Sequence, residues 1–462
     1  MAGNIQIHSP IDDSLVGEVL AMTAEDVDAA YAKLTDAQQS WAQLTRGERA
    51  DVLNGLAGVL RDNSAELSDL LVHEIAKTPA EATDEILRSA DLIDFTAVQL
   101  GQLQDETLRS EEFPGTEPGR VQSVTRVPLG VVLAIGPFNY PVNLTVSKIV
   151  PALAMGNTVM FKPPSQGSVV GARMVGLWHE AGLVKNELIV VTGKSSEIGD
   201  SLVTHPSVGG IALTGSTKVG EHIAGLAGMA PLMLELGGND AAIVLADADL
   251  DLAAKHITIG AFKYAGQRCT AVKRVYVAKQ VAEQLTERIV AQRDKTFQTS
   301  GDPRQHPVGP VISDAQADYL QELLDDAVGQ GAEVAAGGHR DGRCWEATVV
   351  SNIPHEARLV EEEQFGPLLP VVTVEGADEA VSKANDSEYG LQASVFSEDQ
   401  AHAEALASQL EVGGVHINGP DQRGPDNFMF VGHKKSGVTP QGGRFALEAM
   451  SKLKGTVHND AS

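Results

Sequence analysis

The chain has 462 residues, of which 43% are hydrophobic, and it contains 46 glycines and 21 prolines. This composition is typical of a folded soluble protein of about two or three domains, and it excludes a disordered or fibrous chain. The formal net charge of -27 excludes a nucleic-acid partner, because binding phosphate backbones needs a basic face.

The apolar runs and the number of cysteines indicate in which cellular compartment the protein is located. The longest runs, such as GVVLAIGPFNYPVNL, are broken by Gly, Pro and Asn, so we expect no membrane span. The N-terminal MAGNIQIHSPIDD lacks a basic region followed by an apolar one, so no secretory signal is expected. Two cysteines form no disulfide framework, which favours a reducing, cytoplasmic location. One of them, Cys344, lies in a predicted surface turn and receives no role.

The first hundred residues are predicted to be helical. Residues 50–77 repeat apolar side chains at helical spacing. The pattern breaks at FPGTEPG, residues 113–119, and VQSVTRV then alternates like an exposed strand. We therefore predict a hairpin arm that leaves the main body at this point.

From about residue 131 to 245, short apolar strands alternate with helical stretches. The predicted strands are VVLAIG, TVMFKP, LIVVTG, GIALTG and AAIVLA. This alternation is typical of an open parallel sheet, which binds ligands at the carboxyl ends of its strands. A second α/β region is expected over about 246–420, and it opens with a helix over 247–262 that stops before Gly266.

Cys269 is expected in the loop just past this helix. Arg268 precedes it, and Lys273 and Arg274 follow closely. Nearby positive charge favours the thiolate, which is the form in which cysteine is a nucleophile. The alternative is an inert buried cysteine, which the polar loop disfavours.

Two further polar residues follow apolar strands. Glu235, in LELGG, ends a strand, where burial would raise the pKa of its carboxyl and suit a general base. Asn139, in GPFNYPVN, can donate to a developing oxyanion. The alternatives are a surface glutamate at a strand end and an ordinary turn asparagine.

Three segments have the features of a cofactor site. TGSTKVG, residues 214–220, joins a strand to a helix whose N-terminus can hold a phosphate, although it lacks the G-x-G-x-x-G pattern. Lys162, in FKPPSQGS, ends another strand and can reach a ribose or phosphate. In EEEQFGP, Glu363 lies nearest the Phe-Gly-Pro turn. The alternatives are a solvated lysine and a solvated acidic run.

The motifs together resemble the aldehyde dehydrogenase superfamily. In order they are PFNYP, FKPPSQGS, TGSTKVG, LELGG, GQRCT, EEQFGP and KKSG, within about residues 125–450. FKYAGQRCTAVKR and LEVGGVHINGPDQRGPDNFMFVGHKKSG are similar to its non-phosphorylating glyceraldehyde-3-phosphate dehydrogenase branch. The resemblance implies an α/β fold with a Rossmann-type NADP-binding domain (1–111 and 129–235), an α/β catalytic domain (236–420) and a small β oligomerisation arm (112–128 and 421–462).

The resemblance also implies the chemistry. Cys269 attacks the aldehyde, the Asn139 amide and the Cys269 N–H hold the oxyanion, and Glu235 activates the water that hydrolyses the thioester. NADP is expected, with NAD as the alternative, because Ser165 stands where NAD-preferring relatives carry a glutamate that would repel a 2′-phosphate. The implied cofactor-binding residues are Lys162, Ser165, Lys194, Gly215, Ser216, Glu363 and Phe365.

The substrate is less narrowly defined. Tyr140, Arg268 and Arg423 match the tyrosine and arginines that hold the phosphate in this branch, and Thr270 is expected on the pocket floor. Our alignment places Gln102 where the branch has a further arginine, and glutamine carries no charge. Glyceraldehyde 3-phosphate, oxidised to 3-phosphoglycerate, is the first expectation. Lactaldehyde, glyceraldehyde or a semialdehyde such as succinic semialdehyde is the alternative.

The residues disfavour two other classes of function. A binding protein that has kept the fold without chemistry is disfavoured, because every catalytic residue type is present. Acyl transfer to coenzyme A or phosphate is disfavoured by Glu235, since such transfer needs no water-activating base. We expect no metal ligands, a homodimer or homotetramer assembled through the arm, and a small aldehyde as the only other partner.

Overall fold

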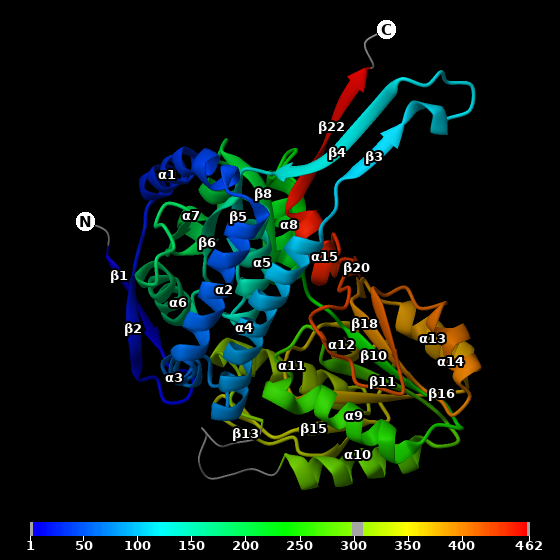
Figure 1. Cartoon of the computed structure of the whole chain (residues 1–462). Coiled ribbons are helices and arrows are strands. Elements are labelled where there is room, and N and C mark those ends of the chain that lie inside the picture. The colour runs from blue at the N-terminus through cyan, green and yellow to red at the C-terminus, as the bar shows by residue number, and fades with distance from the viewer. Residues whose placement is uncertain (1–2, 298–307, 460–462) are drawn as a thin grey trace.

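The computed structural model describes residues 3–297 and 308–459. Its two main bodies are each built on one sheet, and a thin arm projects from them (Figure 1). The strand orders are β21-β9-β8-β5-β6-β7 in the first sheet and β12-β15-β16-β11-β10-β18-β19 in the second. The predicted α/β fold is thereby confirmed.

The first sheet is parallel except at one edge, where β21 pairs antiparallel with β9. β5 and β6 are almost fully buried and apolar, as expected of parallel strands covered on both faces. The strands are β5 (Val131–Ile135), β6 (Thr158–Lys162), β7 (Leu188–Val190), β8 (Val208–Thr214), β9 (Leu232–Glu235) and β21 (Gly437–Val438).

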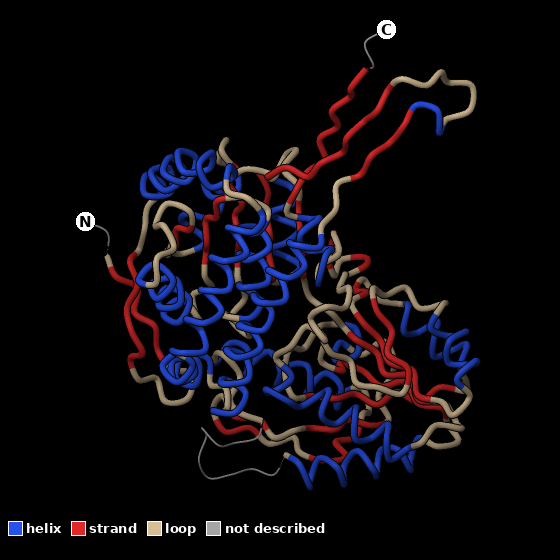
Figure 2. Tube along the Cα trace, in the orientation of Figure 1, coloured by secondary structure: helices blue, strands red, loops and turns tan. Residues whose placement is uncertain are grey.

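Helices cover both faces of this sheet (Figure 2). One core contains side chains of α2 to α6, and the other contains side chains of α1, α7 and α8. Three of the N-terminal helices begin at threonine capping boxes, which fix their starts. The helices are α1 (Ala24–Gln43), α2 (Arg46–Asp62), α3 (Ser64–Ile75), α4 (Pro79–Gln102), α5 (Asn143–Ala154), α6 (Ser168–Glu180), α7 (Ser195–Thr204) and α8 (Thr217–Leu226).

The N-terminal prediction was incomplete. Residues 24–102 are helical, but a hairpin of β1 (Asn4–His8) and β2 (Leu15–Leu20) precedes them. β1, NIQIH, does alternate polar and apolar side chains, and this signal was overlooked, whereas β2, LVGEVL, shows no such alternation.

The second body contains the other sheet and its own core. AAIVLA forms β10, which belongs to this sheet and not to the first, because it pairs with β11 and β18. The strands are β10 (Asp240–Val244), β11 (Val272–Ala278), β12 (Glu333–Ala336), β15 (Thr348–Ser351), β16 (Leu368–Val374), β18 (Gln392–Phe396) and β19 (Gly414–Ile417). Its helices are α9 (Leu250–Phe262), η2 (Lys263–Gly266), α10 (Ala282–Thr296), α11 (Asp314–Gly329), α12 (Arg358–Glu361), α13 (Ala377–Asn385) and α14 (Gln400–Ala407). Two small ribbons complete it: β13 (Arg340–Asp341) with β14 (Cys344–Trp345), and β17 (Tyr389–Gly390) with β20 (His433–Lys434).

The arm is a three-stranded antiparallel sheet that leaves the body (Figure 1). It consists of β3 (Glu106–Arg109), β4 (Arg120–Pro128) and β22 (Ser451–Asn459), with the short η1 (Ser110–Glu112) between β3 and β4. Its extent differs from the expected 112–128 and 421–462. β3 joins it, whereas β21 pairs with the first sheet and α15 (Gly443–Ala449) packs on α4 and α5.

Candidate active site

Two pockets meet at Cys269. One, of about 330 Å³, contains arginine and lysine side chains, and the other, of about 430 Å³, has mainly apolar walls. Cys269 and Asn139 line both pockets. A reactant in one pocket and a cofactor in the other would therefore meet at this sulfur.

A strained turn delivers Cys269 to this place. Tyr264, Ala265 and Gly266 all have positive φ, at 53°, 53° and 67°, directly after α9. The Tyr264 hydroxyl donates to the Ile75 carbonyl at 3.0 Å, which ties the turn to the end of α3. Left-handed backbone at non-glycine residues costs energy and persists where surrounding contacts enforce it.

The Cys269 sulfur does not have the electrostatic environment predicted from its neighbours. Burial raises the pKa of Cys269 to about 12, and the charges of Glu235 and Asp240 act in the same direction. Lys273 lowers the pKa but is outweighed. Lys273 thus favours the thiolate as predicted, but burial and the two carboxylates have the larger effect, so the neighbouring charge does not produce a thiolate in this arrangement. Arg274 illustrates why: its guanidinium donates to the backbone carbonyls of residues 239 and 384.

Glu235 is the last residue of β9, and its carboxylate is held in place by three hydrogen bonds. Its Oε2 accepts hydrogen bonds from Lys148 Nζ and Thr214 Oγ1, both at 2.7 Å, and its Oε1 accepts one from Arg423 Nη1 at 2.8 Å. Burial by itself raises the pKa of Glu235, but the charges of Arg423 and Lys148 together lower it to about 2. The expected raised pKa is thus wrong, because the two cations outweigh desolvation.

Lys148 was missed in the sequence, although a signal exists. It lies in α5, NLTVSKIVPALA, whose residues are all buried, and its side chain is 1% exposed. A lysine within an apolar helix is rarely buried without a partner, so its position indicates a hidden carboxylate. It also donates to Gln441 Oε1 at 2.8 Å.

Asn139 stands between the two loops of the site. Its Nδ2 donates to the Gln267 carbonyl at 2.9 Å, two residues before Cys269. A side-chain amide has two N–H groups, so one can fix the plane of the amide while the other remains for a reacting oxygen.

The apolar pocket contains most of the residues expected to bind a dinucleotide. Five of the seven predicted cofactor residues line it: Lys162, Gly215, Ser216, Glu363 and Phe365. Ser165 and Lys194 are not among the lining residues, although their chain neighbours 164 and 195 are. The Ser216 hydroxyl caps α8 by accepting from the Val219 N–H, and both residues line the pocket, so the N-terminus of this helix is available to a phosphate bound there.

Two charged groups of this pocket are held in place. Burial lowers the pKa of Lys162 to about 8, and its Nζ donates to the Pro163 carbonyl at 2.8 Å. Glu363 Oε1 accepts from the Gly238 N–H at 3.0 Å, and burial raises the pKa of this carboxyl. A Cβ at Gly237 would meet Glu363 Oε2 at 2.4 Å, so the glycine of LELGG is what admits Glu363. These donors and acceptors fit a nicotinamide dinucleotide.

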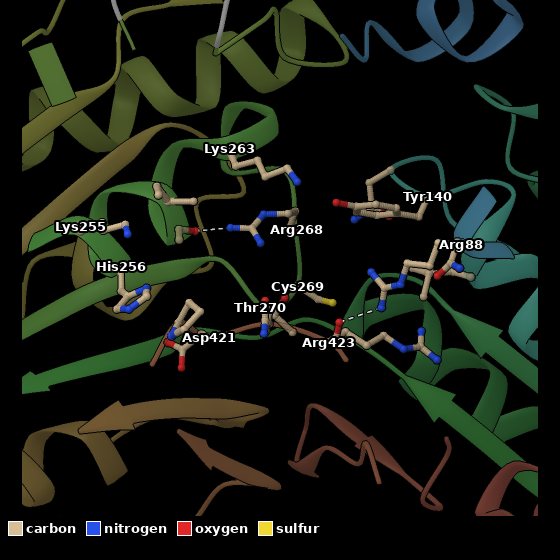
Figure 3. Close-up of a pocket in the computed structure, with 17 residues that line it drawn as sticks. Arg88, Tyr140, Lys255, His256, Lys263, Arg268, Cys269, Thr270, Asp421 and Arg423 are labelled. Atoms are coloured by element: carbon tan, nitrogen blue, oxygen red, sulfur yellow. Dashed lines mark hydrogen bonds between the residues drawn. The ribbon is translucent and has the colours of Figure 1, made fainter. Parts of the chain in front are cut away.

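The polar pocket is lined by cations from three separate segments (Figure 3). Arg268 lies on one side of Cys269, and Arg88 and Arg423 lie with Tyr140 on the other. Lysines of α9 and η2 extend the first side. Residues lining this pocket include Arg88, Asn139, Tyr140, Lys255, His256, Lys263, Arg268, Cys269, Thr270, Asp421 and Arg423.

Gln102 is not part of this pocket. It is exposed at the end of α4, hydrogen-bonded by Gln99, and lines a separate depression near Arg126. Arg88 is the arginine that α4 contributes, fourteen positions earlier and therefore about 21 Å away along the helix axis. The prediction that this arginine is missing is wrong. Its helical neighbours Glu85 and Ser89 are both buried, so this face of α4 is turned inward, which the structure shows and the sequence pattern does not.

The two sheets, the cysteine shared by two pockets and the lining of the apolar pocket are those of a cysteine-dependent dehydrogenase. The chain belongs to the aldehyde dehydrogenase family, which matches residues 2–456. The predicted resemblance is thereby confirmed.

Individual relatives are similar along almost the whole chain. An NADP-dependent glyceraldehyde-3-phosphate dehydrogenase of Streptococcus equinus is 45% identical over 458 residues, covering 99% of this chain and 96% of the relative. A crystal structure of the enzyme of that name from Bacillus halodurans C-125, complexed with NADP, has a TM-score of 0.97 and 44% identity, covering 99% of this chain and 96% of that one. A 3-sulfolactaldehyde dehydrogenase of Priestia aryabhattai is 35% identical, covering 96% of this chain and 92% of the relative.

Proposed function

We propose that this protein oxidises glyceraldehyde 3-phosphate to 3-phosphoglycerate with NADP. The observation that carries the proposal is the convergence of Arg88, Arg268 and Arg423 with Tyr140 around Cys269. Guanidinium groups match the geometry and charge of phosphate, and an uncharged aldehyde would leave their remaining donors, such as the unpartnered Arg268 Nε, unused. The names of the Streptococcus and Bacillus relatives support the same substrate and cofactor.

The first half-reaction forms a thioester. Cys269 Sγ releases its proton to solvent water as it bonds to the aldehyde carbon, and the π electrons of the carbonyl move to its oxygen, which becomes an oxyanion. The free N–H of the Asn139 amide and the Cys269 backbone N–H donate to that oxyanion. NADP, when bound in the apolar pocket, supplies the acceptor for the hydride that leaves the same carbon.

The second half-reaction hydrolyses the thioester. A water molecule attacks the thioester carbonyl, its proton passes to Glu235, and the sulfur leaves as thiolate and takes up a proton. Glu235 with a pKa of about 2 is a weak base, so it has to lose a cation partner first. Arg423 contacts Glu235 and also lines the substrate pocket. We infer that a substrate phosphate that binds Arg423 weakens this contact and raises the pKa of Glu235.

Cofactor choice rests on charge. No acidic side chain stands at position 165, and Lys162 and Lys194 lie at or beside the pocket. We propose that Lys162, Ser165 and Lys194 favour the 2′-phosphate of NADP over NAD. Glu363 and Phe365 are proposed to hold the nicotinamide end, and Gly215 and Ser216 the pyrophosphate.

Initial-rate NADPH formation across a substrate panel tests the proposal. The panel is glyceraldehyde 3-phosphate, glyceraldehyde, lactaldehyde, succinic semialdehyde and 3-sulfolactaldehyde, each with and without coenzyme A. We expect the highest kcat/KM for glyceraldehyde 3-phosphate and no stimulation by coenzyme A. Cys269→Ala should abolish turnover, and Cys344→Ala should not change it. A higher kcat/KM for an uncharged aldehyde than for glyceraldehyde 3-phosphate would refute the assignment of a phosphate-binding pocket. A higher kcat/KM for 3-sulfolactaldehyde would show that the pocket binds a sulfonate instead of a phosphate.

The arm supports an assembly proposal. Its outer strands β3 and β22 are exposed almost throughout, with large apolar side chains such as Leu108, Leu453 and Val457 on the surface, and the central β4 is half-buried. Because unpaired strand edges of this kind are usually covered, we propose a homodimer or homotetramer joined through the arm. Light scattering after gel filtration, with and without residues 451–462, tests it.

Within the described ranges, none of the helices has the length and apolar character that crossing a membrane requires. Both cysteines are free, in keeping with a cytoplasmic location, which we propose.

A further inference from the structure

A buried ion pair lies beneath the active site and takes no part in the chemistry proposed above. Lys77 follows α3, and Glu85 lies in the second turn of α4. Their side chains are 1% and 0% exposed, and the Lys77 ammonium contacts Glu85 Oε2. Removing two charges from water costs several kcal/mol for each ion, so such a pair needs compensating contacts.

Glu85 anchors the loop that carries Asn139. Its other oxygen, Oε1, accepts hydrogen bonds from the backbone N–H groups of Val142 at 2.9 Å and Asn143 at 3.1 Å. These two N–H groups lie at the start of α5, where no intrahelical acceptor is available. The side chain of Asn143 is also held, because its Nδ2 donates to Ser89 Oγ at 3.4 Å, and Ser89 lies one turn further along α4 than Glu85.

Lys77 contacts both catalytic loops at once. Its Nζ lies 3.4 Å from the ring centroid of Tyr140, next to Asn139, and 5.0 Å from that of Tyr264, in the turn before Cys269. An ammonium over an aromatic face is attracted by the ring quadrupole, most strongly where water is excluded. One buried cation thus joins the loop of the oxyanion donor to the loop of the nucleophile.

We propose that Lys77 and Glu85 are positioning residues that hold Asn139 at the correct distance from Cys269. The two loops belong to different bodies of the protein, and Asn139 bridges them through the Gln267 carbonyl. A displacement of about 1 Å at a reacting group can cost roughly 100-fold in rate. The inference rests on the proposed role of Asn139 as oxyanion donor.

Charge-neutral double variants separate positioning from stability. Lys77→Met or Glu85→Gln alone leaves a buried unpaired charge and should lower Tm. The double variant removes both charges, while the glutamine oxygen can still accept from the two α5 N–H groups. We expect the double variant to have a Tm close to wild type and an unchanged Kd for NADP, with kcat/KM lowered about 10- to 100-fold. The matched surface control, Lys279→Met with Glu375→Gln, should leave kcat/KM unchanged, since that pair is exposed.

A double-mutant cycle with Asn139→Ala decides the question. Asn139→Ala alone should lower kcat about 100- to 1,000-fold. If Lys77 and Glu85 act through Asn139, adding their double variant should cost no more than about twofold beyond this. Fully additive losses, or a folded double variant with wild-type kcat/KM, would overturn the inference. If the Met/Gln variant fails to fold, Lys77→Gln with Glu85→Gln, which keeps a hydrogen bond between the two side chains, gives the same readouts. Wild-type activity of Asn139→Ala would instead refute the proposed oxyanion role.

Discussion

Replacing Arg88 by glutamine should convert the enzyme from a phosphate-selective to an unselective aldehyde dehydrogenase. Arg88 Nε and Nη2 donate to Asp426 at 2.6 and 2.9 Å, and Nη2 also donates to the Arg423 carbonyl at 2.8 Å. The guanidinium is therefore held rigidly at the pocket wall. Its remaining donors can bind a substrate phosphate, so little ordering entropy is lost on binding.

The size of the effect follows from these contacts. A hydrogen bond to a charged group contributes about 1.5–3 kcal/mol, which corresponds to roughly 10- to 150-fold in kcat/KM. The change also leaves the Asp426 carboxylate, 15% exposed, without its cation near the phosphate, so we expect the upper part of this range. For glyceraldehyde, which has no phosphate, the loss should stay within about threefold.

The assay is the ratio of kcat/KM for glyceraldehyde 3-phosphate to that for glyceraldehyde, measured by NADPH formation. Gln102→Arg is the control on the same helix, and it should change neither value because position 102 lies outside the pocket. An equal loss for both substrates would show that Arg88 supports the fold and does not bind the phosphate. An unchanged ratio would refute the assignment of the anion pocket.

Three further predictions concern the other groups of the site. Glu235→Gln should form about one equivalent of NADPH per active site and then slow by at least roughly 100-fold, because the thioester is no longer hydrolysed; quenched-flow measurement showing no burst would contradict this order of steps. The rate of Cys269 alkylation by iodoacetamide, without cofactor, should rise about tenfold per pH unit from pH 7 to 10, because the pKa is raised to about 12 and the thiolate fraction grows throughout; a plateau below pH 9 would mean that burial is outweighed. Ser165→Glu should lower the preference for NADP over NAD at least about tenfold through repulsion of the 2′-phosphate, and an unchanged ratio of kcat/KM for the two cofactors would place position 165 away from the ribose.

The sequence by itself determined the family, the parallel strands and most positions of chemical interest. Apolar runs such as those of β5 and β6 predict buried strands wherever they lie in the fold, because the pattern is local. The motifs around Cys269, Glu235 and Asn139 are local in the same sense. Their polar residues follow strand or helix ends, and their glycines permit close approach, as at Gly237 beneath Glu363.

Only the tertiary structure decided which charges meet. Arg88, Arg268 and Arg423 come from α4, from the loop before β11 and from the loop after β19, so no spacing in the sequence shows that they converge. The shift in the pKa of Glu235 is opposite to the predicted one for the same reason. The cations that lower this pKa, Lys148 and Arg423, lie 87 and 188 positions away along the chain. Burial can be predicted from a strand pattern, whereas the electrostatic free energy of a buried group depends on which charges lie within a few ångströms of it, and that is a property of the folded chain.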